Sequence, residues 1–124
     1  MSKARPKYLN LVRIRLPVPG FVSILHRISG ALLFLLIPGL LYLWQLSLQS
    51  PDTFASFQAF MSHPLSKLAA IAFAWAYLHH LCAGVRHLAL DLHYGTALET
   101  ARATSWAVLG VSAFLTLVFG ALIW

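Results

Sequence analysis

Long runs of apolar residues alternate with short polar stretches along this chain. Three runs, about 21–49, 65–94 and 98–124, exceed the roughly 20 residues that an α-helix needs to cross a bilayer. Backbone polar groups in hydrocarbon must be paired within a helix or a closed barrel, and barrel strands are shorter, about 10 alternating residues each. The pattern therefore predicts an all-α integral membrane protein with three transmembrane helices, folded as a single domain over 1–124.

The polar stretch before the first apolar run ends in turn-forming residues. Residues 1–20 close with Pro17, Pro19 and Gly20. Proline fixes φ and moves the preceding residue away from helical geometry. We therefore expect a lead-in over 1–20, with the first helix beginning near Phe21 or Ser23.

The stretch between the first two runs carries a helix start. Ser50 suits an N-cap, Pro51 suits the first helical position, and Asp52 brings an acid into the first turn. A short helix is therefore expected over about 51–61. Its large side chains share one face, which favours a helix in the membrane interface over a plain loop. These side chains are Phe54, Phe57, Phe60 and Met61.

Two further signals lie between the second and third runs. Gly95 suits the end of a helix, because glycine adopts the left-handed conformation at low cost. Thr96 and Glu99 have the spacing of a capping box, which would start the third long helix.

Charge is scarce and unevenly placed. Charged residues make up 10% of the 124 residues, against about 25% in a soluble protein, and the net charge is +6. Lys and Arg gather on the cytoplasmic side of membrane proteins. We therefore expect a cytoplasmic lead-in and amino terminus, and a periplasmic carboxyl terminus. Six basic residues precede or open the first run, namely Lys3, Arg5, Lys7, Arg13, Arg15 and Arg27.

The same features weigh against other classes of protein. The basic lead-in is short and runs into an apolar segment, so topology and contact with membrane lipid explain it better than nucleic-acid binding. The first apolar run is too long for a signal peptide. The lack of a long targeting presequence favours the bacterial inner membrane over a processed mitochondrial chain. The single Cys82 excludes an internal disulfide.

Residues 79–87 of the second run contain three histidines and an arginine, which are costly at membrane depth and commonly mark functional sites. Positions four and seven apart share a helix face, so His80, Gly84 and His87 form one stripe, while His79 and Arg86 form a neighbouring one. A neutral imidazole is a good ligand for haem iron. Gly84 would leave room for the macrocycle, and Arg86 and His87 would pair with its propionates. The cluster favours a cofactor site over histidines that only hydrogen-bond a neighbouring helix.

The residues alone leave two points open. His79 and His80 point about 100° apart on a helix, so only one of them can face a given haem. A six-coordinate haem needs two axial ligands, and no second histidine lies at mid-membrane depth, since His26, His63 and His93 lie near span ends. Either the iron is five-coordinate or another subunit supplies the second ligand. We expect a partner membrane subunit.

The start of the first long helix carries a second constellation. Ser23 and Arg27 are one turn apart, and they place a hydroxyl and a cation at the cytoplasmic mouth of the membrane. A quinone headgroup has two carbonyl acceptors above an apolar tail, and these donors suit it. The alternative is that Ser23 is near a helix cap and Arg27 contacts lipid headgroups or sets topology.

Two motifs resemble a known family. They are S-I-L-H-R-I-S-G over residues 23–30 and H-x-x-x-G-V-R-H-x-x-x-D over residues 80–91, preceded by R-P at 5–6 and I-R-L-P at 14–17. Together they resemble the cytochrome b membrane-anchor subunit of succinate dehydrogenase (complex II). The resemblance covers essentially the whole chain.

The resemblance implies roles for individual residues. His80 would be an axial ligand of haem b, and a second, smaller anchor subunit would supply the other axial histidine. His26 and His87 would lie close to the haem propionates. The ubiquinone site would be lined by Ser23 and Arg27, with Leu16, Pro17 and Ile24 as further lining.

The resemblance also implies a division of labour. A flavoprotein subunit would oxidise succinate, and an iron–sulfur subunit would pass the electrons to quinone, in respiration and the tricarboxylic acid cycle. This chain has no flavin motif or cysteine cluster. It would be one half of a heterodimeric helical anchor, without catalysis of its own. The alternatives are a haem-free anchor of a fumarate reductase and a small proton-conducting or transport protein.

Overall fold

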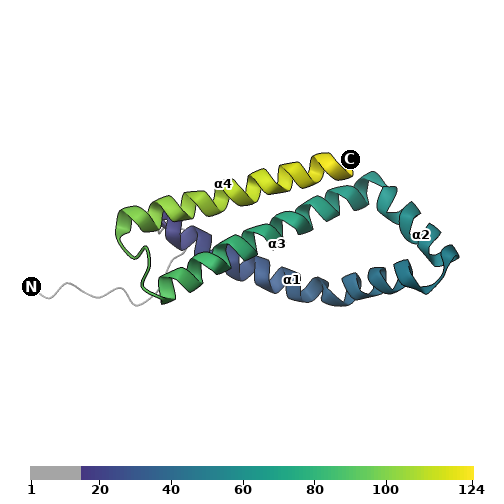
Figure 1. Cartoon of the computed structure of the whole chain (residues 1–124), viewed down its shortest axis with the longest axis horizontal. Helices are drawn as coiled ribbons and strands as arrows, with labels where there is room; N and C mark the ends of the chain where they lie inside the picture. Colours follow the sequence, from purple (N-terminus) through teal and green to yellow (C-terminus); the bar gives the residue numbers. More distant parts are fainter. Residues whose placement is uncertain (1–14) are drawn as a thin grey trace, which may run out of the picture.

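Four α-helices make up the part of the chain that the computed structural model describes, residues 15–124. They are α1 (Val18–Gln49), α2 (Pro51–Ser62), α3 (Pro64–Asp91) and α4 (Leu98–Ile123). Helices α1, α3 and α4 are each long and apolar enough to cross a membrane, which confirms that the three expected spans form long helices. These helices alternate in direction, and the short α2 joins α1 to α3 (Figure 1).

Helix α1 begins at Val18, three residues before the expected start at Phe21. Pro17 is its N-cap, and Pro19 lies in its first turn. Proline is tolerated there because the first N–H groups of a helix have no intrahelical partner. The two prolines therefore start the helix rather than delay it. The helix also continues through Pro38, which supplies no backbone N–H.

The start of α2 is the one that the sequence predicts. Ser50 is the N-cap, Pro51 takes the first position, and Asp52 lies in the first turn. The Ser50 hydroxyl accepts from the Thr53 N–H at 3.2 Å, and the Thr53 hydroxyl accepts from the Ser50 N–H at 3.0 Å. This reciprocal capping box satisfies two backbone donors. The helix ends at Ser62, close to the expected 61.

The end of α3 differs from the expectation. The helix ends at Asp91, three residues before the expected 94, because His93 adopts a φ of 64°. The N–H groups of His93 and Tyr94 donate to carbonyls of the last turn of α3, both at 2.9 Å, in a Schellman motif. Histidine therefore takes the left-handed position expected of Gly95, which lies two residues further on.

Helix α4 begins at Leu98 as expected, but without the expected capping box. Its N-cap is Ala97, which makes no side-chain capping bond. Thr96 precedes the cap by one residue, so Thr96 and Glu99 are out of register with the two positions that a capping box requires. The capping-box prediction is wrong for this reason.

Helices α3 and α4 pack through small side chains. Ser105, Ser112 and Thr116 are buried on α4, and their hydroxyls donate to carbonyls of their own helix at 2.7, 3.2 and 2.7 Å. Further along, a Cβ on Gly120 would lie 3.3 Å from Cδ1 of Ile71. Small residues allow membrane helices to approach closely, and here their hydroxyls need no partner on α3.

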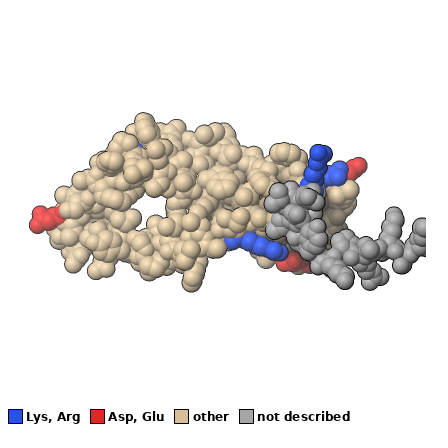
Figure 2. Space-filling view, turned by 180° about the vertical axis from the view of Figure 1, so that it is seen from behind, with Lys and Arg blue, Asp and Glu red and all other residues tan. Residues whose placement is uncertain are grey.

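The surface has the character of a membrane protein. Charged side chains on the face shown in Figure 2 gather toward the two ends of the molecule. Large apolar side chains are widely exposed, including Phe34 at 71%, Leu117 at 73% and Leu122 at 80%. Lipid or partner helices are suited to cover such a surface.

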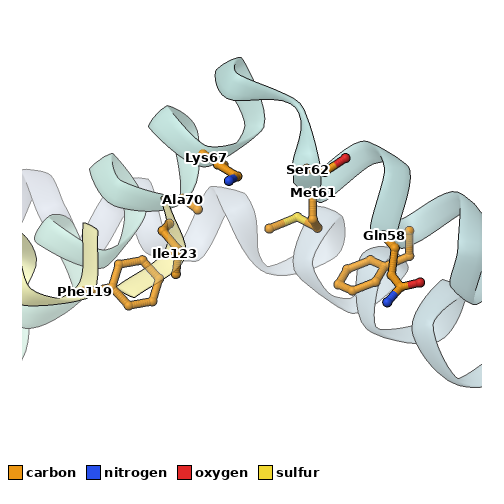
Figure 3. A pocket seen from close by; sticks show the side chains of 8 residues that line it. Gln58, Met61, Ser62, Lys67, Ala70, Phe119 and Ile123 are labelled. Atoms are coloured by element: carbon orange, nitrogen blue, oxygen red, sulfur yellow. The ribbon is translucent and has the colours of Figure 1, made fainter. Parts of the chain in front are cut away.

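Two hollows lie at the α2 end of the bundle. One, of roughly 440 Å³, lies among α2, α3 and α4, and its lining includes Met61, Lys67 and Phe119 (Figure 3). The other, of roughly 640 Å³, is lined mainly by apolar residues of α1, α2 and α3, among them Leu43 and Phe73. Both lie at the opposite end of the bundle from the two sequence motifs.

Candidate functional site

Three histidines from α1 and α3 meet near the end of the bundle where α1 begins. The rings of His26 and His80 lie face to face, with centroids 4.2 Å apart and planes 10° from parallel. The His87 ring lies 5.0 Å from that of His26, tilted by 48°. The predicted stripe of His80, Gly84 and His87 therefore faces His26, which is 54 residues from His80 in sequence. We call His26, His80 and His87 the histidine cluster.

The Nδ1 atom of His80 is held by α1. It lies 3.0 Å from the carbonyl oxygen of His26 and 3.2 Å from the hydroxyl oxygen of Ser29. A carbonyl oxygen only accepts, so Nδ1 donates and carries the proton of the neutral ring. The lone pair then lies on Nε2, which makes no hydrogen bond within the described part of the chain. Nε2 is the nitrogen left for a metal.

Two glycines lie where α1 and α3 approach. A Cβ on Gly30 would lie 2.8 Å from Cε1 of His80, which is too close for a real side-chain carbon. A Cβ on Gly84 would lie 3.5 Å from Nε2 of His26, an ordinary contact. Gly30 therefore lets the His80 ring lie against α1, while Gly84 faces the edge of the His26 ring.

His79 lies in the interior of the bundle. Its side chain is fully buried, its ring stacks on Trp75 at 5.4 Å, and neither ring nitrogen makes a well-formed hydrogen bond to another described residue. It shares the buried face of α3 with Ala76, Ala83 and Arg86. The two stripes that helical spacing predicts on α3 therefore face different surroundings, and the His79 stripe is the enclosed one.

Arg86 is directed at α4. Its Nε donates to the Thr104 hydroxyl at 3.0 Å, and its Nη2 donates to the Ala101 carbonyl at 3.1 Å. The side chain is buried, with 8% of its surface exposed. The guanidinium therefore joins α3 to α4, and the structure does not bring it into the histidine cluster with His87.

The residues expected at a quinone site lie at the start of α1. Ser23 and Ile24 are half-buried, and Arg27 is exposed. Leu16 and Pro17, just before the helix, are also exposed. None of these residues lines either of the two hollows described above. Within residues 15–124, the structure therefore shows no enclosed pocket around them.

Three residues without an assigned role in the sequence lie at these contacts. Ser29 and Gly30 follow His26 by three and four positions, so their shared helix face was a usable signal. Thr104 carried no such signal, because the sequence does not say which face of α4 meets α3. The described residues contain no group of three His, Cys, Asp or Glu side chains that could hold a metal ion. A metal at His80 would need ligands from elsewhere, as a porphyrin provides.

Comparison with known proteins gives a consistent result. The family model described as succinate dehydrogenase/fumarate reductase transmembrane subunit matches residues 1–119. The succinate dehydrogenase cytochrome b556 subunit of Coxiella burnetii is 35% identical over 125 residues, covering 100% of both chains. Its namesake from Paracoccus denitrificans is 35% identical over 120 residues, covering 92% of this chain and 90% of the relative. Its namesake from Rickettsia felis is 32% identical over 114 residues, covering 92% and 89%.

Proposed function

Because this chain belongs to the succinate dehydrogenase/fumarate reductase transmembrane subunit family, we propose that it is a membrane-anchor subunit of a succinate:quinone oxidoreductase. In this role it shares haem b with a second, smaller anchor subunit. It also forms part of the site at which ubiquinone is reduced with electrons from succinate. Its three apolar helices supply the anchor.

The observation that carries the proposal is the way His80 is held. A histidine that ligates iron commonly donates its other ring N–H to a carbonyl, which fixes the tautomer and the ring orientation. His80 donates from Nδ1 to the His26 carbonyl and keeps the Nε2 lone pair unused. The residues present therefore fit a haem, which supplies an iron centre for single-electron transfer when it is bound. A haem-free anchor or a transporter has no evident use for this arrangement.

Burial favours His80 over His79 as the ligand. A haem shared between two subunits must reach both of them, so its ligand cannot be sealed inside one chain. His79 is fully buried among the helices of this chain, whereas His80 is half-buried. On the same side, the imidazoles of His26 and His87 are available to donate hydrogen bonds to haem propionates. Arg86 is left out of this set because its guanidinium bonds α4.

Ser23 and Arg27 would serve the quinone. The Ser23 hydroxyl would donate to a quinone carbonyl and orient the headgroup. The Arg27 guanidinium would stabilise the negative charge that develops on a quinone oxygen during reduction, since a preorganised charge acts most where charge develops. Leu16, Pro17 and Ile24 would contact the ring or tail. The exposure of Arg27 suits a site completed by the iron–sulfur subunit and the second anchor.

The proposal includes partner subunits and an orientation in the membrane. The iron–sulfur subunit would dock at the end where α1 begins, since the electrons must reach quinone there, and the flavoprotein would bind beyond it. The basic residues that precede or open α1 support a cytoplasmic location for this end. The chain would therefore span a bacterial inner membrane, with its carboxyl terminus in the periplasm.

Purification of the complex through a tag on this chain tests the proposal. We expect a flavoprotein, an iron–sulfur protein and a second small membrane protein to co-purify, with the reduced-minus-oxidised spectrum of a low-spin b-type haem. His80→Ala should remove that spectrum, and His79→Ala should leave it. A complex that lacks haem would point to a haem-free fumarate reductase anchor, and a chain that purifies alone would reject the anchor role.

A further inference from the structure

Three polar atoms form a closed triangle beside α1. The Ser29 hydroxyl donates to the His26 carbonyl at 3.0 Å, and both oxygens lie near Nδ1 of His80, at 3.2 and 3.0 Å respectively. Since the Ser29 proton is directed at the carbonyl, the Ser29 oxygen turns a lone pair toward Nδ1. The His80 N–H is therefore shared between two acceptors. Ser29 is 3% exposed, so water does not readily replace it.

Gly30 provides the space in which the His80 ring lies against α1. A Cβ at this position would lie 2.8 Å from Cε1, 3.3 Å from Nδ1 and 3.8 Å from Nε2 of His80. One edge of the imidazole thus rests on the backbone of α1, next to the residue that binds its N–H. Any side chain at Gly30 would push the ring away from both acceptors.

We propose that Ser29 and Gly30 are positioning residues for the iron ligand. Ser29, with the His26 carbonyl, sets the direction and electron density of Nε2, and Gly30 sets how close the His80 ring lies to α1. This inference rests on the proposed function, because it takes His80 as the haem ligand. It adds that α1 controls the redox behaviour of a haem whose ligand comes from α3.

Ser29→Ala in the assembled complex tests the first half. Loss of one hydrogen-bond acceptor for Nδ1 makes the imidazole donate less electron density to the iron through Nε2, which disfavours ferric haem. The midpoint potential of the haem should therefore shift upward while haem content stays unchanged. Ser29→Thr keeps the hydroxyl and should restore the potential. Ser47→Ala is the matched control, since the Ser47 hydroxyl also donates to the carbonyl three residues before it in α1, at 2.7 Å, without a histidine partner. A Ser29→Ala potential equal to that of Ser47→Ala would overturn the role of Ser29.

Gly30→Ala tests the second half against Gly39→Ala, because a Cβ on Gly39 would meet no atom within 4 Å. We expect Gly30→Ala to change the g values of the ferric low-spin haem in electron paramagnetic resonance, or to convert part of it to high spin. Gly39→Ala should keep the wild-type spectrum. A wild-type spectrum for Gly30→Ala would overturn the role of Gly30.

His80→Ala in the same series separates this inference from the proposed function. If His80→Ala loses the low-spin haem while the Ser29 and Gly30 variants match their controls, only the inference fails. If His80→Ala keeps the haem, the ligand assignment itself fails, and the inference falls with it.

Discussion

Nε of Arg86 lies 3.0 Å from the hydroxyl oxygen of Thr104, and this bond fixes the guanidinium on α4. The Ala101 carbonyl accepts a second bond from the same side chain, at 3.1 Å. Hydrogen bonds to a charged group contribute about 1.5–3 kcal/mol each. The two hydrogen bonds therefore hold α3 and α4 together, and they lie on a different face of α3 from His80.

Thr104→Val should destabilise the complex without changing its haem. The substitution keeps the shape of the side chain but leaves Nε of Arg86 buried without its acceptor, at a cost of about 1–3 kcal/mol. Thermal unfolding of the purified complex in detergent should show a lower Tm, with an unchanged reduced haem spectrum. Thr96→Val, at an exposed position, is the control. An unchanged Tm with a shifted haem potential would instead place Arg86 at the haem.

His79→Leu should be tolerated. The imidazole is fully buried, and neither nitrogen makes a well-formed hydrogen bond within residues 15–124; each unpaired buried polar group costs about 1–3 kcal/mol. An apolar side chain of similar size removes that cost and keeps an apolar contact with Trp75. We expect the Tm of the complex to stay the same or rise, with haem retained. A clear fall in Tm would show that a group outside this chain or an ordered water satisfies the ring.

Arg27→Ala should impair quinone reduction selectively. Loss of a charge that stabilises the reacting oxygen should lower the rate of succinate-dependent quinone reduction by roughly tenfold or more, which corresponds to at least about 1.4 kcal/mol. Succinate oxidation with an artificial acceptor that draws electrons from the soluble subunits should continue. Arg102→Ala, another exposed cation near the same end, is the control. Equal loss of both activities in Arg27→Ala would point to failed assembly.

His26→Phe separates the backbone of residue 26 from its side chain. The carbonyl that accepts from His80 belongs to the backbone, so it survives the change, and an aromatic ring remains to stack on His80. Haem content should stay close to wild type. The midpoint potential of the haem should shift, because the haem propionates lose the hydrogen-bond donor that the His26 imidazole would supply. Redox titration with optical detection measures both. Loss of the low-spin haem would contradict the assignment of the carbonyl as the acceptor that holds His80.

Local features of the fold were accessible from the sequence because they depend on short spacings. Span length predicts three helices, and Ser50-Pro51-Asp52 predicts the start of α2 within a residue. The end of α3 was harder to predict. Glycine usually takes the left-handed position that ends a helix, which pointed to Gly95, but here His93 takes it. Backbone hydrogen bonds to the last turn stabilise that choice, and the sequence does not display them.

The site was accessible only in part for a related reason. Helical spacing separates His80 from His79 and groups His79 with Arg86, and the buried face of α3 agrees. Spacing cannot say which stripe meets α1 and which meets α4, because that depends on packing between segments far apart in sequence. The contact of His80 with Gly30 and the bond of Arg86 to Thr104 are both results of that packing.

Pro38 lies inside α1 and separates the part of the helix that contacts His80 from the part nearer α2. Because proline has no N–H, the carbonyl of Phe34, four residues earlier, loses its helical donor, and the helix is easier to bend at that point. The half before the proline carries His26, Ser29 and Gly30, whereas the half after it supplies most of the α1 lining of the larger hollow. Bending at this joint would let the distal half of α1 follow a neighbouring helix or lipid during assembly. The contacts that α1 makes with His80 of α3 would then be insulated from that movement.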